Sequence, residues 1–273
     1  MIFSKKRIGL EVWVENLQAK GRLSFSLDEL MKSYKNTSAT ALKQSLDRLS
    51  KKKKVVSVFK GYYVIVPPQY ANKGIAPTTL FIDGLMKFLQ RNYYVGLLNA
   101  AALHGSSHQQ PQEFFVVTEY PVLRKTLKKG LVINYVNTKQ MPSEKLLEKR
   151  KTETGYINIS SPLLTALDLI SYEKKIGGLN RAATVINELM ENIKPKAITN
   201  DWIEYAFATS LQRLGFILDE ILDRKDLADK IYSQCKKKEI KFYKIALKAS
   251  TPKNNKAVNE KWQIIINTEI EID

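Results

Sequence analysis

The sequence predicts a mixed α+β protein with a small basic N-terminal domain and a larger α/β domain after it. A chain of 273 residues is long enough for about two domains, and its hydrophobic fraction of 44% suits a globular core. Residues 67–78 hold three prolines and a glycine, which interrupt both helix and strand patterns. We therefore expect a boundary near Pro68, with one domain at residues 1–68 and the other at residues 69–273.

The first predicted helices lie before residue 35. Ile8, Val12 and Leu17 define an apolar helical face that ends near Gly21. Ser26 to Glu29 has the spacing of a capping box, in which the serine side chain accepts a hydrogen bond from the backbone N–H three residues later. A second short helix should therefore begin directly after Ser26.

A third helix and a hairpin complete the N-terminal domain. The helix should cover residues 39–50, with Leu42, Leu46 and Leu49 facing the core. Two β-prone runs around Lys60-Gly61 predict the hairpin. Helices followed by a hairpin are typical of a winged helix-turn-helix, whose recognition helix enters the major groove of DNA.

The residues of this domain predict double-stranded DNA as its partner. The third helix is polar opposite its leucines, and the lysines after it would lie beside the DNA backbone. Asp47 would repel phosphate, so it should point aside or accept a hydrogen bond from cytosine. The alternative is an ordinary solvated helix face, since polar residues opposite a leucine stripe occur on any surface helix. The candidate DNA-binding residues are Ser38, Thr40, Lys43, Gln44, Arg48, Lys51, Lys52, Lys53 and Lys60.

The charge of the chain agrees with a nucleic-acid partner. The formal net charge is +17, and residues 1–70 hold 14 Lys and Arg against 5 Asp and Glu. Such a basic module attracts phosphate, although charge alone also keeps a protein soluble. The run Lys236-Lys237-Lys238 is most simply a solvated helix end, which the helix dipole favours. It could also extend the DNA-binding face.

Composition also bears on where the protein acts. No stretch of about 18 apolar residues exists, so we expect no membrane-spanning helix. The basic start, Met1 to Arg7, is not followed by an apolar signal-peptide segment. Cys235 is the only cysteine, so an intrachain disulfide is impossible. The expectation is a cytoplasmic protein without membrane contact.

The second domain should contain both helices and strands, beginning with a helix at residues 79–90. The predicted strands are residues 114–117, 132–136, 155–159 and 263–266. The predicted helices are residues 95–103, 163–172, 180–191, 202–222, with a break near Gly215, and 225–235. Ser161 and Pro162 should cap and open the helix at residue 163.

Residues 93–118 hold the most informative pattern. An apolar helix runs into His104-Gly105-Ser106, and a turn and a strand follow, which is the layout that opens a nucleotidyltransferase domain. In that fold the Gly-Ser backbone holds phosphates, and aspartates on the strand hold Mg²⁺, which prefers carboxylate ligands. The predicted strand here has no aspartate. We therefore expect a degenerate nucleotidyltransferase-like domain that has no catalytic residues, no metal and no cofactor.

Other catalytic readings of this stretch are weaker. His104 and His108 have helical spacing, but zinc would need at least a third protein ligand. Ser106 and Ser107 lie near His104, but the Gly-x-Ser-x-Gly elbow of α/β-hydrolases is absent, and so is a P-loop. Hydrogen bonding within the turn is the role that we expect of His104.

The same stretch resembles the AbiEi antitoxins of bacterial type IV toxin–antitoxin systems, which act in abortive infection and phage defence. Further blocks resemble this family in the same order, and together they span nearly the whole chain. The blocks are residues 66–70, 73–77, 81–86, 161–169, 177–180, 211–215 and 259–262.

The resemblance implies an antitoxin that is also a transcriptional repressor and not an enzyme. Members of the family repress their own operon through the N-terminal winged helix-turn-helix. Their C-terminal domain counters a nucleotidyltransferase toxin, AbiEii, without a stable complex. We therefore expect promoter DNA and such a toxin as partners. The alternatives are a DNA-binding transcription regulator with a ligand-sensing C-terminal domain, or a nucleotidyltransferase with a DNA-binding appendage, which the missing aspartates disfavour.

Overall fold

The structure is a computed structural model that describes residues 9–106, 111–252 and 256–272. The chain forms two compact units. The first unit consists of Met1–Tyr93, Gln112–Met141 and Lys149–Asn158, and the second of Tyr94–Pro111, Pro142–Glu148 and Ile159–Asp273. Helices and strands occur together in the chain, so the predicted mixed α+β class is confirmed. The boundary near Pro68 lies inside the first unit and stays a prediction.

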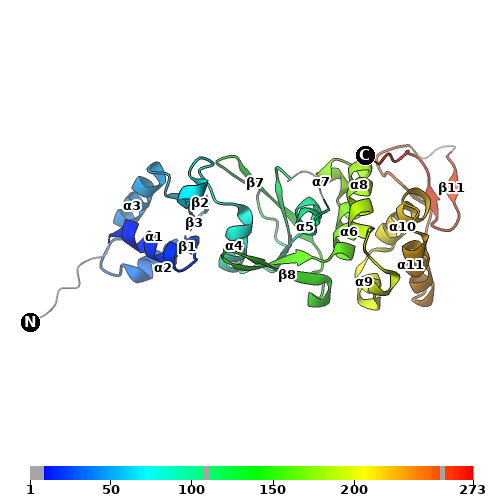
Figure 1. Ribbon diagram of the computed structural model, residues 1–273, viewed down its shortest axis with the longest axis horizontal. Helices are drawn as coiled ribbons and strands as arrows, with labels where there is room; N and C mark the ends of the chain where they lie inside the picture. Colours follow the sequence, from blue (N-terminus) through cyan, green and yellow to red (C-terminus); the bar gives the residue numbers. More distant parts are fainter. Residues whose placement is uncertain (1–8, 107–110, 253–255, 273) are drawn as a thin grey trace, which may run out of the picture. The chain divides into compact units, whose positions relative to one another are not determined.

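The N-terminal part of the first unit has the three expected helices and the hairpin, and it adds a strand between the first two helices that was not predicted (Figure 1). Its elements are α1 (Leu10–Ala19), β1 (Ser24–Ser26), α2 (Leu27–Ser33), α3 (Ala39–Lys51), β2 (Val55–Phe59) and β3 (Tyr62–Ile65). The strands form an antiparallel sheet in the order β1-β3-β2. The side chains of Ser26 and Ser38 accept hydrogen bonds from the N–H groups of Glu29 and Ala41, at 3.1 and 3.2 Å. These caps fix where α2 and α3 begin.

A common apolar core joins these helices to one face of the sheet. Leu42, Leu46 and Leu49 of α3 are buried in it, as their spacing predicts. The prediction is wrong at Val12, which is 48% exposed. Helix α1 instead packs Leu10, Trp13, Val14 and Leu17 against the core, which is the i, i+3, i+4, i+7 pattern of an amphipathic helix. Ile8 lies outside the described residues.

The other face of the sheet is covered by α4 (Ile82–Phe88), which follows the short helix η2 (Thr78–Leu80). The rings of Tyr62 and Phe88 have centroids 5.1 Å apart, and the Tyr62 hydroxyl donates to Ser24 Oγ at 2.7 Å. Gly84 permits this approach, because an added Cβ would overlap the Tyr62 hydroxyl. The sheet therefore has little free surface.

A larger sheet has six strands. The elements from residue 68 to 160, apart from those already given, are η1 (Pro68–Tyr70), β4 (Tyr93–Val95), α5 (Leu97–Leu103), β5 (Phe114–Glu119), β6 (Thr126–Lys128), β7 (Leu131–Thr138), η3 (Glu144–Leu146), β8 (Leu147–Thr152) and β9 (Gly155–Ser160). The strand order is β6-β7-β5-β4-β9-β8, and β5 runs parallel to β7. The strands predicted at 114–117, 132–136 and 155–159 are confirmed as β5, β7 and β9.

The rest of the second unit is mostly helical. Its elements are α6 (Pro162–Ser171), α7 (Glu173–Ile176), α8 (Leu179–Met190), η4 (Pro195–Ala197), α9 (Asn200–Tyr205), α10 (Ala208–Phe216), the π-helical η5 (Ile217–Ile221), α11 (Lys225–Lys237), β10 (Ile245–Ala246), β11 (Val258–Asn259) and β12 (Ile264–Ile265). Ser161 caps α6 and Pro162 is its first residue, as predicted. Of the helices described, none has the length and apolar character to cross a membrane.

The predicted break at Gly215 is wrong. Gly215 lies inside α10, and the helical segment is interrupted at Ala206 and Phe207 instead. Trp262 explains the glycine, because an added Cβ would overlap its indole ring. Trp262 is fully buried, and its Nε1 donates to Asp219 Oδ2 at 2.8 Å. A small residue is therefore needed at position 215 for packing and not for a bend.

Gly215→Ala should destabilise the protein. Adding a methyl group to a packed site typically costs about 1–3 kcal/mol, and more where the neighbour cannot move. Thermal unfolding of the full chain should show a lower midpoint than the wild type. Gly9→Ala is the control, since nothing lies within 4 Å of a Cβ added there. Equal midpoints for Gly215→Ala and the wild type would contradict the packing described.

Candidate functional site

The polar face of α3 is exposed along its length. Thr40, Lys43, Gln44 and Arg48 are all exposed, while the leucines of the helix face the core. Residues three and four apart share a helix face, so these side chains lie together. In the described part of the chain, Lys43 and Arg48 have no ion pair or side-chain hydrogen bond. Their charges are therefore available to a ligand.

Lys43 of α3 and Lys60 of the hairpin turn line one hollow of about 450 Å³. Leu27, Ser57 and Tyr63 also line it, and Asp28 adds an acid. The structure thus brings together two predicted DNA-binding residues that are 17 positions apart in the sequence. A phosphate in this hollow would meet two cations.

Other predicted DNA-binding residues already form hydrogen bonds or ion pairs within the protein. The Ser38 hydroxyl caps α3, as described above. Lys51 Nζ pairs with Asp47 Oδ2 at 2.9 Å, one helical turn away. Asp47 therefore turns towards a lysine of its own helix. Both side chains are more than half exposed, so this pair adds little stability and can open in favour of a phosphate.

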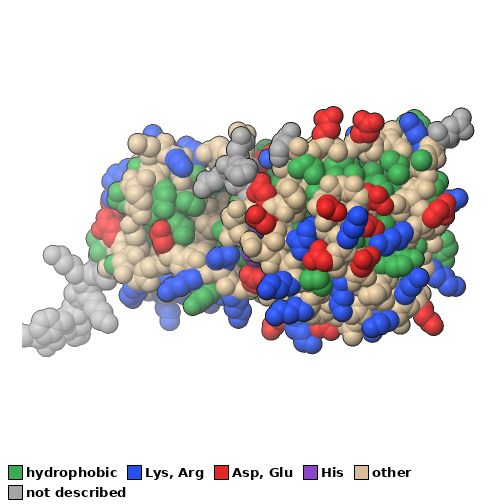
Figure 2. Space-filling model, turned by 45° about the vertical axis from the view of Figure 1, so that its right-hand side comes forward, with side chains coloured by type: hydrophobic (Ala, Val, Ile, Leu, Met, Phe, Trp, Pro, Cys, Tyr) green, Lys and Arg blue, Asp and Glu red, His purple; other side chains and the backbone are tan. Residues whose placement is uncertain are grey.

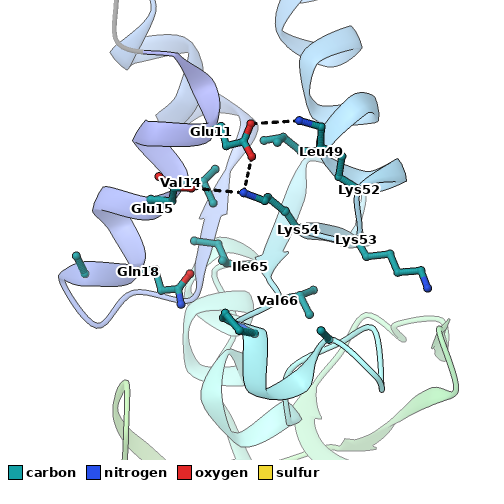
Figure 3. Close-up of a pocket in the computed structure, with 13 residues that line it drawn as sticks. Glu11, Val14, Glu15, Gln18, Leu49, Lys52, Lys53, Lys54, Ile65 and Val66 are labelled. Atoms are coloured by element: carbon teal, nitrogen blue, oxygen red, sulfur yellow. Dashed lines mark hydrogen bonds and ion pairs between the residues drawn. The ribbon is translucent and has the colours of Figure 1, made fainter.

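Lysines that follow α3 border a groove of about 710 Å³ beside α1 (Figure 3). Lys52 Nζ pairs with Glu11 Oε2 at 3.4 Å, and Lys54 pairs with Glu11 and, at 3.4 Å, with Glu15. Lys54 and then Lys52 lower the pKa of Glu11, so its carboxylate is charged at neutral pH. Figure 3 shows Lys53 pointing away from these pairs.

The predicted lysines after α3 therefore differ in their availability. Lys52 is held by an acid of α1, whereas Lys53 has no partner among the described residues. Lys54 is the lysine most strongly tied to the acids, and the sequence does not reveal this, because Glu11 is 43 positions away. Arg48, Lys43 and Gln44 remain as donors suited to base edges, and Lys53 and Lys60 as cations suited to phosphates.

The turn at His104-Gly105-Ser106 is a helix end and not an open phosphate cradle. The Gly105 N–H donates to the Ala102 carbonyl at 3.1 Å, and the Ser106 N–H donates to the Ala101 carbonyl at 2.9 Å. With Gly105 at φ +86°, these bonds form a Schellman motif that closes α5. Both amides that the phosphate reading needs are thus used within the helix. His104 Nε2 lies 2.8 Å from the Ser160 carbonyl and donates to it, in agreement with a structural role.

Strand β5 extends beyond its predicted end to Glu119, a carboxylate that the shorter strand omitted. Glu119 Oε1 accepts from the Asn92 N–H at 3.3 Å, so this acid has a structural partner. Over the ranges that the structure describes, no cluster of three His, Cys, Asp or Glu side chains could hold a metal ion. Ser107 and His108 lie outside those ranges.

Asp168 of α6 is a buried acid. In the sequence it is noted only as part of the family block at residues 161–169. Among the described residues, neither its Oδ2 nor the nearby Tyr94 hydroxyl makes a hydrogen bond of normal geometry. Burial raises the pKa of the Asp168 carboxyl to about 8, and Tyr94 opposes this shift. An acid among leucines and an alanine at residues 163–169 is the sequence signal that could have identified it.

The fold is shared with a solved structure. The RV2827C protein from Mycobacterium tuberculosis superposes with a TM-score of 0.66 at 13% sequence identity, over 93% of this chain and 89% of that chain. At this identity the likeness concerns the fold alone. No protein of curated function matches the sequence.

A family match points to the class of protein. Residues 94–220 match the AbiEi antitoxin C-terminal domain, a domain of toxin–antitoxin systems. Over these residues the chain is similar to the AbiEi antitoxins, and the resemblance found in the sequence is confirmed there. Residues 1–93, including α3 and the hairpin, lie outside the matched range.

Proposed function

We propose that the chain is an antitoxin that represses its own operon through α3 and the β2–β3 hairpin and counters a nucleotidyltransferase toxin. Helices α1 to α3 and the sheet β1-β3-β2 have the order of a winged helix-turn-helix. The observation that carries the DNA proposal is the polar face of α3, where Lys43 and Arg48 lie opposite buried leucines and have no partner among the residues that the structure describes. The antitoxin role rests on the family match.

The proposal is tested by gel shifts with the DNA upstream of the chain's own gene. Phosphate contacts release counterions, so affinity should fall steeply as salt rises. At physiological salt the upstream DNA should still bind more tightly than a shuffled duplex of equal length. Equal binding of both duplexes would remove the operator claim. A ligand-sensing regulator would bind DNA in the same way, so rescue of cells that express the toxin separates that alternative.

Glu11→Gln should increase affinity for any duplex. The substitution keeps the shape of the side chain but removes the charge that pairs with Lys52 and Lys54. If these lysines reach phosphates once released, the dependence of log affinity on log salt should steepen by about one unit for each new contact. Glu148→Gln changes the net charge equally at an exposed position on β8. Equal effects of the two variants would show that only net charge matters.

We also propose that the chain does not transfer nucleotides. The turn that would hold phosphates has both amides bonded within α5, and β5 offers only Glu119 in place of a pair of aspartates. Transfer of this type depends on carboxylate-held metal ions. Incubation with labelled nucleotides, Mg²⁺ or Mn²⁺ and tRNA should therefore label nothing. Labelling that is lost in Ser106→Ala would reverse this proposal.

A further inference from the structure

We propose that the second unit carries a binding surface for single-stranded nucleic acid, centred on Tyr243. This Tyr243 surface consists of exposed side chains from α11, the segment after it and the residue before α10. Its residues are Phe207, Lys237, Lys238, Lys241, Tyr243 and Lys244. All except Phe207 lie beyond residue 220, where the matched antitoxin domain ends. The proposal does not depend on DNA binding by α3.

The aromatic side chains of this surface are exposed on a fixed backbone. Phe207 is 68% exposed and Tyr243 is 69% exposed. The Tyr243 carbonyl accepts a hydrogen bond from Nε2 of Gln212 at 2.8 Å, and Gln212 is 1% exposed. The neighbouring Phe242 packs against buried Trp262, with ring centroids 5.9 Å apart. A ring presented in this way binds a flat partner at a low cost in ordering.

The same contacts join Phe207 to the lysines. Phe207 directly precedes α10, and Gln212 lies about 8 Å further along the helix axis, given the rise per residue. Lys238 forms an ion pair with Glu204 of α9, three residues before Phe207. Phe207 and Tyr243 are therefore carried by segments that are bonded to each other.

The charge of this region is strongly positive. Residues 236–248 hold six lysines and one glutamate. Lys237, Lys241 and Lys244 have no ion pair within the described ranges. Figure 2 shows hydrophobic side chains exposed among lysines, arginines and acids on one face of the C-terminal part. Several lysines without an ion pair among the described residues therefore lie within six positions of Tyr243 in the sequence.

This chemistry fits single strands better than the other polymers. Aromatic rings stack on unpaired bases while lysines meet the phosphates, which is how single-strand binders work. In a duplex the bases already stack on each other, so Tyr243 would add nothing. Protein interfaces are depleted in lysine, which makes a protein a poorer match for a surface with four lysines.

The test is fluorescence anisotropy of the full-length protein with labelled oligouridylate and oligodeoxythymidylate of about 12 nucleotides, a typical site size. Tyr243→Ala should lower affinity for single strands by about 5- to 150-fold, the loss of one stacked base. Tyr243→Phe keeps the ring and should bind like the wild type. Tyr156→Ala is the matched control, since Tyr156 is 58% exposed in the first unit. Tighter binding of oligouridylate assigns RNA, and equal or tighter binding of oligodeoxythymidylate assigns DNA.

The affinity for a mixed-sequence duplex, measured in the same series, distinguishes binding at the Tyr243 surface from binding at α3. Duplex affinity should be unchanged in Tyr243→Ala and reduced in Lys43→Ala/Arg48→Ala, which leaves the single-strand surface intact. The proposal is overturned if the wild type does not bind either oligonucleotide. It is also overturned if Tyr243→Ala and Tyr156→Ala bind alike, or if Tyr243→Ala lowers duplex binding as much as single-strand binding. Loss of duplex binding alone would concern only the proposed operator function.

Discussion

Lys43→Ala and Arg48→Ala should each weaken binding to promoter DNA by about 1–3 kcal/mol, the range for side chains that read bases. Both residues project from the exposed face of α3 and have no partner within the described ranges. DNA would therefore gain their hydrogen bonds without breaking any in the protein. The loss should be larger for the operator than for a shuffled duplex, because shuffled DNA lacks the matching base edges.

The control for charge is Lys174→Ala/Lys175→Ala, which removes two exposed lysines from α7. Gel shifts at a fixed salt concentration should show a small loss for this variant and a large, operator-selective loss for Lys43→Ala/Arg48→Ala. If the two double variants lose the same affinity on both duplexes, α3 does not read sequence and only total charge attracts DNA.

Asp168→Asn should make the protein more stable at alkaline pH than the wild type. Burial raises the pKa of Asp168 to about 8 in the folded state, above the ordinary value of about 4 in the unfolded chain. The folded protein therefore holds this proton more tightly, and stability falls as the pH rises from about 4 to about 8. A shift of this size corresponds to at most about 5 kcal/mol. Asparagine carries no charge and should abolish this dependence.

The measurement is the unfolding midpoint of the full chain at pH 5 and pH 9. The wild type should lose stability between these values, and Asp168→Asn should lose much less. Asp223→Asn serves as the control, since the Asp223 side chain is 89% exposed and its charge costs little to solvate. A wild type and an Asp168→Asn variant with the same change between pH 5 and pH 9 would contradict a neutral buried Asp168.

Local patterns predict helices α2 and α3 well. The caps at Ser26 and Ser38 depend on side chains within three residues of the helix start, so the sequence alone locates α2 and α3. The leucines of α3 are similarly local, because one helical stripe decides their burial. Val12 fails because a stripe drawn through only three residues of α1 cannot choose between neighbouring faces, and Trp13 and Val14 pack against the core instead.

Features that depend on distant partners could not be predicted. Gly215 suggests a helix break until Trp262, 47 positions later, is known to fill the space beside it. Lys52 and Lys54 read as free cations until α1 places Glu11 beside them. Short strands such as β1 and β6 have too few residues for an alternating pattern and exist through pairing with β3 and β7.

The candidate site also has some features that the sequence predicts and others that depend on distant partners. The sequence identifies the exposed polar face of α3, because burial of the leucines leaves it outside. It does not reveal that Lys43 and Lys60 share a hollow, which requires the hairpin to fold back beside α3. The Gly105-Ser106 pattern was misleading, since a glycine after a helix serves the Schellman motif as readily as a phosphate loop.

The most direct test of the account compares repression and antitoxin action in the same cells. Wild-type chain and the Lys43→Ala/Arg48→Ala variant are expressed at matched levels, with a reporter behind the operon's own promoter and with the partner toxin induced. We expect the variant to lose repression of the reporter and to rescue growth as the wild type does, because the residues matched to the antitoxin domain, 94–220, are unchanged. A variant that still represses, or that no longer rescues growth, would contradict the assignment of DNA binding to α3 and of antitoxin action to the part of the chain that includes residues 94–220.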